Sequence, residues 1–160
     1  MATSTIPAAI DYLVAAVTAL PEAAAPVVVS DGWPTQRSDV GVVIGVTPEN
    51  ADTRDSKTHA QMQLGARTQW EDYTIPCILW AVRAGDGAQK AARDVAFGLF
   101  DAIDTVLRTP DGSTLGGVLK SGTALLSNAV MTPTSEAEKA GEGRICEIYF
   151  EVICRSRSAA

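Results

Sequence analysis

Residues 144–157, RICEIYFEVICRSR, contain the clearest strand pattern in the chain. One alternate set of positions is apolar: Cys146, Ile148, Phe150, Val152 and Cys154. The other set is mostly polar: Glu147, Tyr149, Glu151 and Arg155. Because successive side chains of a strand point to opposite faces, the alternation predicts a strand with one buried face. Such a face needs a covering layer.

Two helices are predicted upstream to supply that layer. In the first, apolar residues recur at steps of three and four and Pro7 falls in the first turn: Ile6, Ile10, Leu13, Val14, Val17 and Leu20. The second follows Asp86, which we expect to cap it, and extends for about twenty residues. Its apolar stripe is Ala88, Ala91, Val95, Leu99, Ile103 and Val106.

The other elements read as strands separated by turns. They are PVVVS at 26–30, DVGVVIGV at 39–46, a weaker alternation around Met62 and Leu64, a stronger strand from about Tyr73 to Arg83, and VLKSGTALLSNAVM at 118–131. Pro76 predicts an edge or a bulge near the start of its strand.

The run 47–60 has no large apolar residue and is expected to be an exposed loop. The order predicts an α+β fold, with a mostly antiparallel sheet, two helices packed on one face, and a single domain over 1–160.

Composition excludes several broad classes of protein. The chain has 160 residues, 46% of them hydrophobic, and a net charge of −6. That acidic balance argues against a phosphate-neutralising surface for nucleic acid. The N-terminal apolar stretch has no preceding basic residue and Asp11 interrupts it, so we expect neither a signal peptide nor a membrane span.

Motifs for chemistry are weak. Cys77, Cys146 and Cys154 have no metal-ligand spacing and are interpreted as core thiols, and the single histidine, His59, as a solvated loop residue. The carboxylates near 31–55 and 136–142 lack the spacing of a calcium loop. The segment AGDGAQK at 84–90 lacks the third glycine of a dinucleotide fingerprint, which favours a helix cap over a phosphate site. We therefore expect no catalytic residue, no cofactor and no metal.

The three tryptophans remain as candidate binding groups, and the basic residues are not interleaved with them in a way that makes a stacking groove for single-stranded nucleic acid. Trp80, within CILWAV, is expected in the core. Trp33 and Pro34 follow a turn made by Asp31 and Gly32, and Trp70 adjoins EDY. Two readings stay open for Trp33 and Trp70: they anchor a protein interface, or they cover the domain's own core.

The whole arrangement resembles the tail terminator proteins of long-tailed (siphovirus-type) bacteriophages, particularly those of phages that infect actinobacteria. The resemblance covers nearly the full chain. It is carried by the N-terminal helix, VVVSDGWP at 27–34, VGVVIG at 40–45, IPCILWAVRAGD at 75–86, DVAFGLFDAIDTVL at 94–107 and CEIYFEVICRSR at 146–157. The Asp-Gly-x-Pro turn is its most specific part.

The resemblance implies a structural virion protein and no enzyme. Such subunits form a ring, usually of six, on the head-proximal end of the tail tube, where they stop tube polymerisation and support head-tail joining. The implied partners are other copies of the chain, the major tail tube protein and a head-tail connector or stopper protein. Genome DNA would pass without specific binding through the acidic channel, and assembly would occur in the host cytoplasm. No membrane is involved.

The expected interface residues are Trp33, Pro34, Arg54, Lys57, Trp70 and Arg155, with Arg54 and Lys57 in a loop that would order on a partner. Two alternatives remain. One is another phage neck or tail-completion subunit, and the other is a small α+β enzyme or ligand-binding domain that uses residues 84–90 as an anion site.

Overall fold

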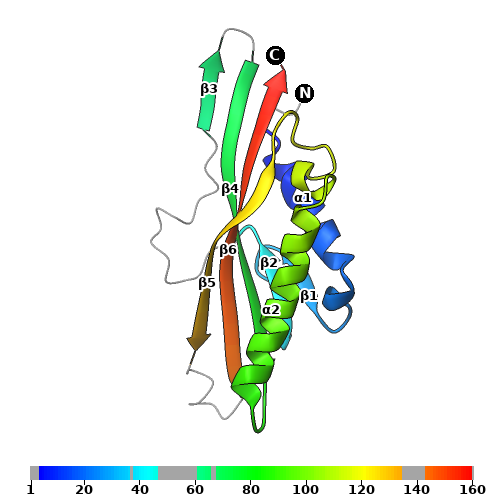
Figure 1. The fold of residues 1–160 in the computed structure, drawn as a ribbon, viewed down its shortest axis with the longest axis vertical. Coiled ribbons are helices and arrows are strands. Elements are labelled where there is room, and N and C mark those ends of the chain that lie inside the picture. The colour runs from blue at the N-terminus through cyan, green and yellow to red at the C-terminus, as the bar shows by residue number, and fades with distance from the viewer. Residues whose placement is uncertain (1–3, 37, 47–60, 66–67, 135–142, 160) are drawn as a thin grey trace.

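Two long antiparallel strands, β4 (Thr68–Arg83) and β6 (Arg144–Ala159), form the centre of the fold and pair over their full sixteen residues. The computed structural model describes residues 4–36, 38–46, 61–65, 68–134 and 143–159. Figure 1 shows the two strands running the length of the molecule. The apolar positions predicted for β6 are all buried, which confirms the alternation.

The remaining strands extend the sheet on both sides of this pair. Its order is β1-β2-β4-β6-β5, and β3 also pairs with β4. The bounds are β1 Val28–Asp31, β2 Val40–Ile44, β3 Gln61–Gly65 and β5 Ala124–Thr134. Only the β1–β2 pair is parallel among the described strands, so the expected mostly antiparallel sheet is confirmed.

The helices α1 (Ile6–Thr18) and α2 (Ala88–Leu107) lie on the same side of the sheet, as predicted (Figure 1). Short 3-10 turns, η1 (Pro21–Ala23) and η2 (Gly112–Thr114), follow them. Helix α1 buries Ala9, Leu13 and Val17, which belong to one apolar stripe. The helix layer thus covers the apolar face of β4 and β6.

The buried stripe of α2 differs from the predicted one. It consists of Ala88, Ala92, Ala96, Leu99, Ile103 and Leu107. Ala91 is exposed, and Val95 and Val106 are only half-buried. The prediction favoured the larger side chains, whereas alanines allow the first half of the helix to approach the sheet closely. The start of α2 also differs, because its N-cap is Gly87 and no side chain caps it, so the expected cap by Asp86 is wrong.

Pro76 was expected to mark an edge or a bulge. The β4–β6 register is continuous through Pro76, opposite Glu151, so there is no bulge. On the other side of β4, the pairing with β2 ends at Cys77 and the pairing with β3 ends at Asp72, so Pro76 lies at a local edge, as expected. The carbonyl oxygen of Pro76 accepts a hydrogen bond from the amide of Gly45, at 2.7 Å. In an antiparallel sheet, the N–H and C=O groups of one residue point towards the same neighbouring strand. The C=O of Pro76 points towards β2, so the position where an N–H would stand also faces that side, at the end of β2, and no strand hydrogen bond is lost there. The strand therefore keeps its proline without a bulge.

The second side of the sheet, which we call the open face, lies opposite the helices. Its residues follow from the register and include Leu125, Ser127, Val130 and Thr132 of β5, Val43 of β2, Trp70, Asp72, Thr74, Pro76, Ile78 and Trp80 of β4, and Glu147, Tyr149, Glu151, Ile153, Arg155 and Arg157 of β6. Val43, Pro76 and Ile78 are buried, so this face is not exposed over its whole length.

Trp80 lies on the open face and not in the helix-covered core where we expected it. Its Nε1–H donates to the carbonyl of Ser38 at 2.9 Å, and its side chain is half-buried. The indole lies directly on Gly41 of β2, where a Cβ atom would stand 2.4 Å from the ring. Glycine at position 41 therefore makes room for the indole.

Candidate interaction surfaces

The turn after β1 presents Trp33 to solvent. Gly32 has a φ of +74°, its amide donates to the carbonyl of Ile44 at 3.0 Å, and its carbonyl accepts from the hydroxyl of Ser30 at 2.8 Å. These contacts fix the turn, yet the Trp33 side chain is 56% exposed. Pro34 is half-buried. More than half of Trp33 is in contact with solvent, which favours the interpretation as an interface anchor over the one in which it covers the domain's own core.

The second tryptophan forms a cluster at the far end of the open face. The guanidinium carbon of Arg155 lies 4.8 Å from the centre of the Trp70 ring, and that of Arg157 lies 5.9 Å from it. Arg155 also pairs with Asp72, with Nε 3.1 Å from Oδ1. Cation–π contacts of this kind hold both guanidinium groups over the indole.

The cluster joins two of the expected interface residues, Trp70 and Arg155, but not Trp33 and Pro34. The end of β1 lies beside β2 near Ile44, which pairs with Cys77, and Trp70 lies about 20 Å further along β4. Arg54 and Lys57 lie outside the described residues, as does His59. Sequence reasoning did not place Arg157 beside Trp70, nor Arg155 over its ring, because the two arginines come from a strand more than eighty positions away.

A buried carboxylate that sequence reasoning missed ties α1 to the sheet. Glu71 is 3% exposed, and its Oε2 accepts from the amide and the hydroxyl of Thr5, at 2.8 and 2.9 Å. Its Oε1 accepts from the Ser4 hydroxyl, and the hydroxyls of Thr5 and Tyr73 lie 3.0 Å apart. A negative charge at a helix N-terminus is favourable. The signal was present: Glu71 shares its parity along the strand with Tyr73 and Ile75, which face the helices.

The centre of the open face carries apolar groups between opposite charges. Leu125 and Ile153 are register partners and are 52% and 37% exposed, and Val130 nearby is 55% exposed. Glu151 accepts hydrogen bonds from the Asn128 amide at 2.6 Å and from the Tyr149 hydroxyl at 2.7 Å. An exposed apolar group flanked by charge is typical of an interaction surface.

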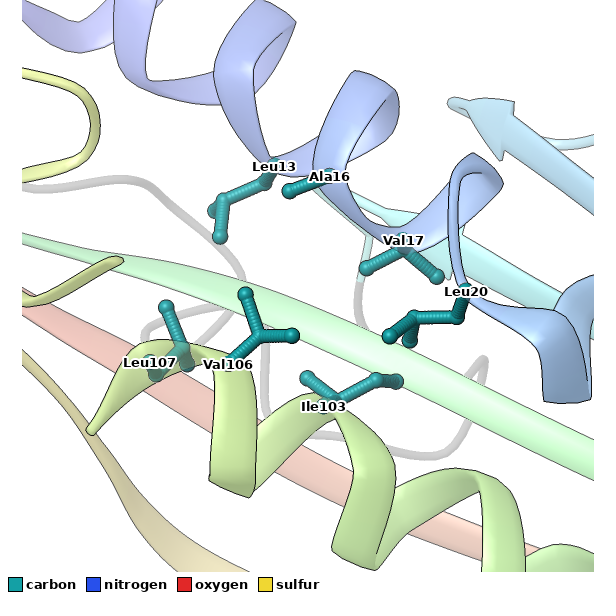
Figure 2. Close-up of a pocket in the computed structure, with 7 residues that line it drawn as sticks. All are labelled: Leu13, Ala16, Val17, Leu20, Ile103, Val106 and Leu107. Atoms are coloured by element: carbon teal, nitrogen blue, oxygen red, sulfur yellow. The ribbon is translucent and has the colours of Figure 1, made fainter. Parts of the chain in front are cut away.

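A shallow depression lies between α1 and α2 (Figure 2). Its lining consists of Leu13, Ala16, Val17, Leu20, Ile103, Val106 and Leu107, all with hydrocarbon side chains. Small-molecule sites usually add a few convergent polar groups that orient the ligand. The depression offers none from these seven side chains, so it does not resemble a site for a polar ligand.

The thiols belong to the core, as predicted. All three cysteines are free and buried. Burial raises the pKa of Cys77 to about 12 and that of Cys154 to about 12, and it also raises the pKa of Cys146. Thiols with such pKa values stay protonated near neutral pH, where they are weak nucleophiles.

Within the part of the chain that the structure describes, no group of three or more His, Cys, Asp or Glu side chains is arranged to hold a metal ion. Among the same residues, no helix combines the length and apolarity needed to cross a membrane. The protein matched none of the protein-family models and no curated protein.

Proposed function

We propose that this protein is a structural subunit of a siphovirus-type phage tail. In this role it forms a ring, of six copies, on the head-proximal end of the tail tube, stops tube polymerisation and offers the surface for head-tail joining. It acts without catalytic turnover or a cofactor. Its partners are further copies of the chain, the major tail tube protein and a head-tail connector or stopper protein.

One observation carries the proposal: the α+β arrangement implied by the resemblance to tail terminators agrees with the observed order of helices and strands. A rigid turn with an exposed tryptophan adds support, because large aromatic side chains often anchor protein interfaces. The net charge of −6 per subunit also agrees with a channel through which DNA passes without adhering.

The test is assembly on tail tubes. Purified protein is mixed with polymerised tail tubes and viewed by negative-stain electron microscopy, while light scattering follows tube elongation. We expect a ring at one end of each tube and an arrest of elongation. A chain that neither forms rings nor binds tube ends would contradict the proposal.

The substitution W33A sharpens this test. We expect W33A to weaken ring formation or tube binding by at least about tenfold, as loss of an interface anchor does. The matched control is F97A, because Phe97 is an exposed aromatic residue on α2. Equal effects of the two substitutions would remove Trp33 from the interface.

A neck or tail-completion subunit is the nearest alternative, and it would bind the connector but not the end of the tube. The same experiment with purified connector rings distinguishes the two roles.

A further inference from the structure

We propose that Trp70, Arg155 and Arg157 form a binding site for an extended acidic segment of a protein, one whose carboxylates are two residues apart. The site lies where β4 begins and β6 ends, on the open face (Figure 1). This inference does not rest on the proposed tail function, because it follows from how the strand register places these three side chains.

The register brings two guanidinium groups onto one indole. Arg157 is the register partner of Trp70, and Arg155 is the partner of Asp72. The two arginines are two residues apart on β6, so they share a face and their Cα atoms are about 7 Å apart. Their guanidinium carbons lie 4.8 and 5.9 Å from the centre of the Trp70 ring. Cation–π attraction therefore holds two like charges close together.

Both arginines keep hydrogen-bond donors for a ligand. Arg155 forms an ion pair with Asp72 through Nε, at 3.1 Å, and its side chain is still 54% exposed. Arg157 is also exposed, and among the described residues its guanidinium group has the Trp70 ring as a partner but no carboxylate. Because an arginine has five N–H donors, most of the hydrogen-bonding capacity of the site is unused.

The site carries an excess of positive charge. On the open face its two arginines are opposed by one carboxylate, that of Asp72, because Glu71 points to the helix side of the sheet. Lys120 is exposed next to the site, and its carbonyl accepts a hydrogen bond from the Arg157 amide at 2.8 Å. Like charges this close repel each other, so a ligand whose negative groups contact both arginines relieves the repulsion.

The spacing of the arginines selects the shape of the ligand. Alternate side chains of an extended segment are also about 7 Å apart on one face, so a segment that runs alongside β6 can place one carboxylate on each guanidinium group. Arginine binds a carboxylate through two parallel N–H···O bonds. Ile153 and its register partner Leu125 continue the surface beyond Arg155 and are 37% and 52% exposed, which gives the same segment an apolar contact.

Nucleic acid offers similar charges but fits the site less well. Proteins that bind single strands stack the bases on open aromatic rings. The Trp70 ring is half-buried and already carries two guanidinium groups. The net charge of −6 on the whole chain also opposes a polyanion, whereas a short acidic segment is affected mainly by charges within about 10 Å. Arginine and tryptophan are, in addition, the residue types that dominate binding energy at protein interfaces.

A titration followed by NMR tests the site. The probe is an acetylated and amidated five-residue peptide with glutamates at its second and fourth positions and threonines elsewhere. We expect it to shift the indole N–H signal of Trp70 and the backbone amide signals of residues 155–157 at low ionic strength. The absence of such shifts at peptide concentrations up to about 20 mM would overturn the proposal.

Two control peptides of the same length test charge and spacing. One has glutamine in place of both glutamates, and the other has the two glutamates side by side. Each control should bind at least about threefold more weakly than the probe, because it loses one or both ion pairs with the arginines. Equal binding of the probe and the glutamine peptide would overturn the role of charge, and equal binding of the two acidic peptides would overturn the proposed spacing.

Substitutions test the side chains on the protein. R155Q and R157Q each remove one guanidinium group at an exposed position, and each should weaken binding of the probe at least about threefold. The matched control is R108Q on α2, because Arg108 is exposed and, like Arg155, is ion-paired with an aspartate. We expect R108Q to bind the probe like the wild type. Wild-type affinity in either R155Q or R157Q would overturn the two-arginine site.

A final titration distinguishes an acidic protein segment from nucleic acid. The second probe is a thymidine trinucleotide without terminal phosphates, which carries two negative charges, as the peptide does. We expect it to bind more weakly than the peptide, because the Trp70 ring is not open for stacking. Tighter binding of the trinucleotide, with shifts at the same signals, would overturn the assignment to a protein ligand.

Discussion

The buried carboxylate of Glu71 provides the sharpest test of how this fold is held together. It joins the residues that precede α1 to the beginning of β4 through bonds to Ser4 and Thr5. The substitution E71Q keeps the size of the side chain but removes its charge and replaces one acceptor oxygen with a donor group. The remaining carbonyl oxygen can still accept from the Thr5 amide and hydroxyl, and the new amide group can donate to the Ser4 hydroxyl, so the bonds change from charged to neutral ones.

The expected loss follows from these bonds. A hydrogen bond to a charged group contributes about 1.5–3 kcal/mol, and the helix dipole adds about 0.3–1 kcal/mol. E71Q should weaken each of the three bonds by about 1 kcal/mol, from the strength of a bond to a charged group to that of a neutral one, although it also removes the cost of burying a charge, which is several kcal/mol. We therefore expect a net loss of about 2 kcal/mol in the free energy of unfolding. For a chain of this length, that corresponds to a fall of about 4–8 °C in Tm.

Thermal unfolding followed by circular dichroism measures the total effect, and hydrogen exchange locates it. Exchange should accelerate in the first turn of α1, including the amide of Ala9, which donates to the Thr5 carbonyl. It should stay unchanged in α2. The matched control is E22Q, at an exposed carboxylate in η1, which should change stability by less than about 0.5 kcal/mol. An E71Q protein as stable as E22Q, with normal exchange in α1, would refute the reasoning.

Two further predictions follow from packing and burial. G41A places a Cβ atom 2.4 Å from the Trp80 ring, so we expect it to lower the free energy of unfolding by about 1–3 kcal/mol and to shift the tryptophan fluorescence to the red. The control is G98A, because nothing lies within 4 Å of a Cβ atom at this helical position. Measured by urea unfolding, G98A should raise the free energy of unfolding by about 0.5–1 kcal/mol. The pKa of Cys77 and that of Cys154 are about 12 in the folded protein, against 9.0 for an ordinary thiol. Because the unfolded chain loses these protons at lower pH than the folded protein, the thiols contribute their full stabilisation below about pH 9. The free energy of unfolding then falls as the pH rises towards 12. Each thiol contributes up to about 1.4 kcal/mol per pH unit, and C77A should remove one such contribution from the slope measured between about pH 9 and 11; an unchanged slope would contradict this explanation.

Local patterns were sufficient to predict much of the fold. The alternation in β6 and the helical spacing in α1 identified these elements and their buried faces, because side-chain period depends only on the backbone of the element itself. The length of α2 was predicted for the same reason. The stripe of α2 was misplaced because the sequence does not show how closely the helix approaches the sheet.

Features that depend on strand register could not be read from the sequence. The start of β4 was expected near Tyr73, but pairing with β3 and with the end of β6 extends it back to Thr68 through polar residues. The same register brings Arg155 onto Trp70. Glu71 was passed over because a charged residue in a strand is usually solvated, and only the docking of α1 supplies its donors.

The β4–β6 ladder also sets the order in which the chain can reach its final form. Thr68 pairs with Ala159, and the intervening chain contains α2 and β5. Contacts this far apart in the sequence close slowly, whereas α2 can form from local contacts alone. During synthesis, β4 therefore has no partner along the side that β6 will occupy until the ribosome has released β6. The apolar face of β4 lacks its β6 neighbour for that interval, and pairing with β6 completes the centre of the sheet.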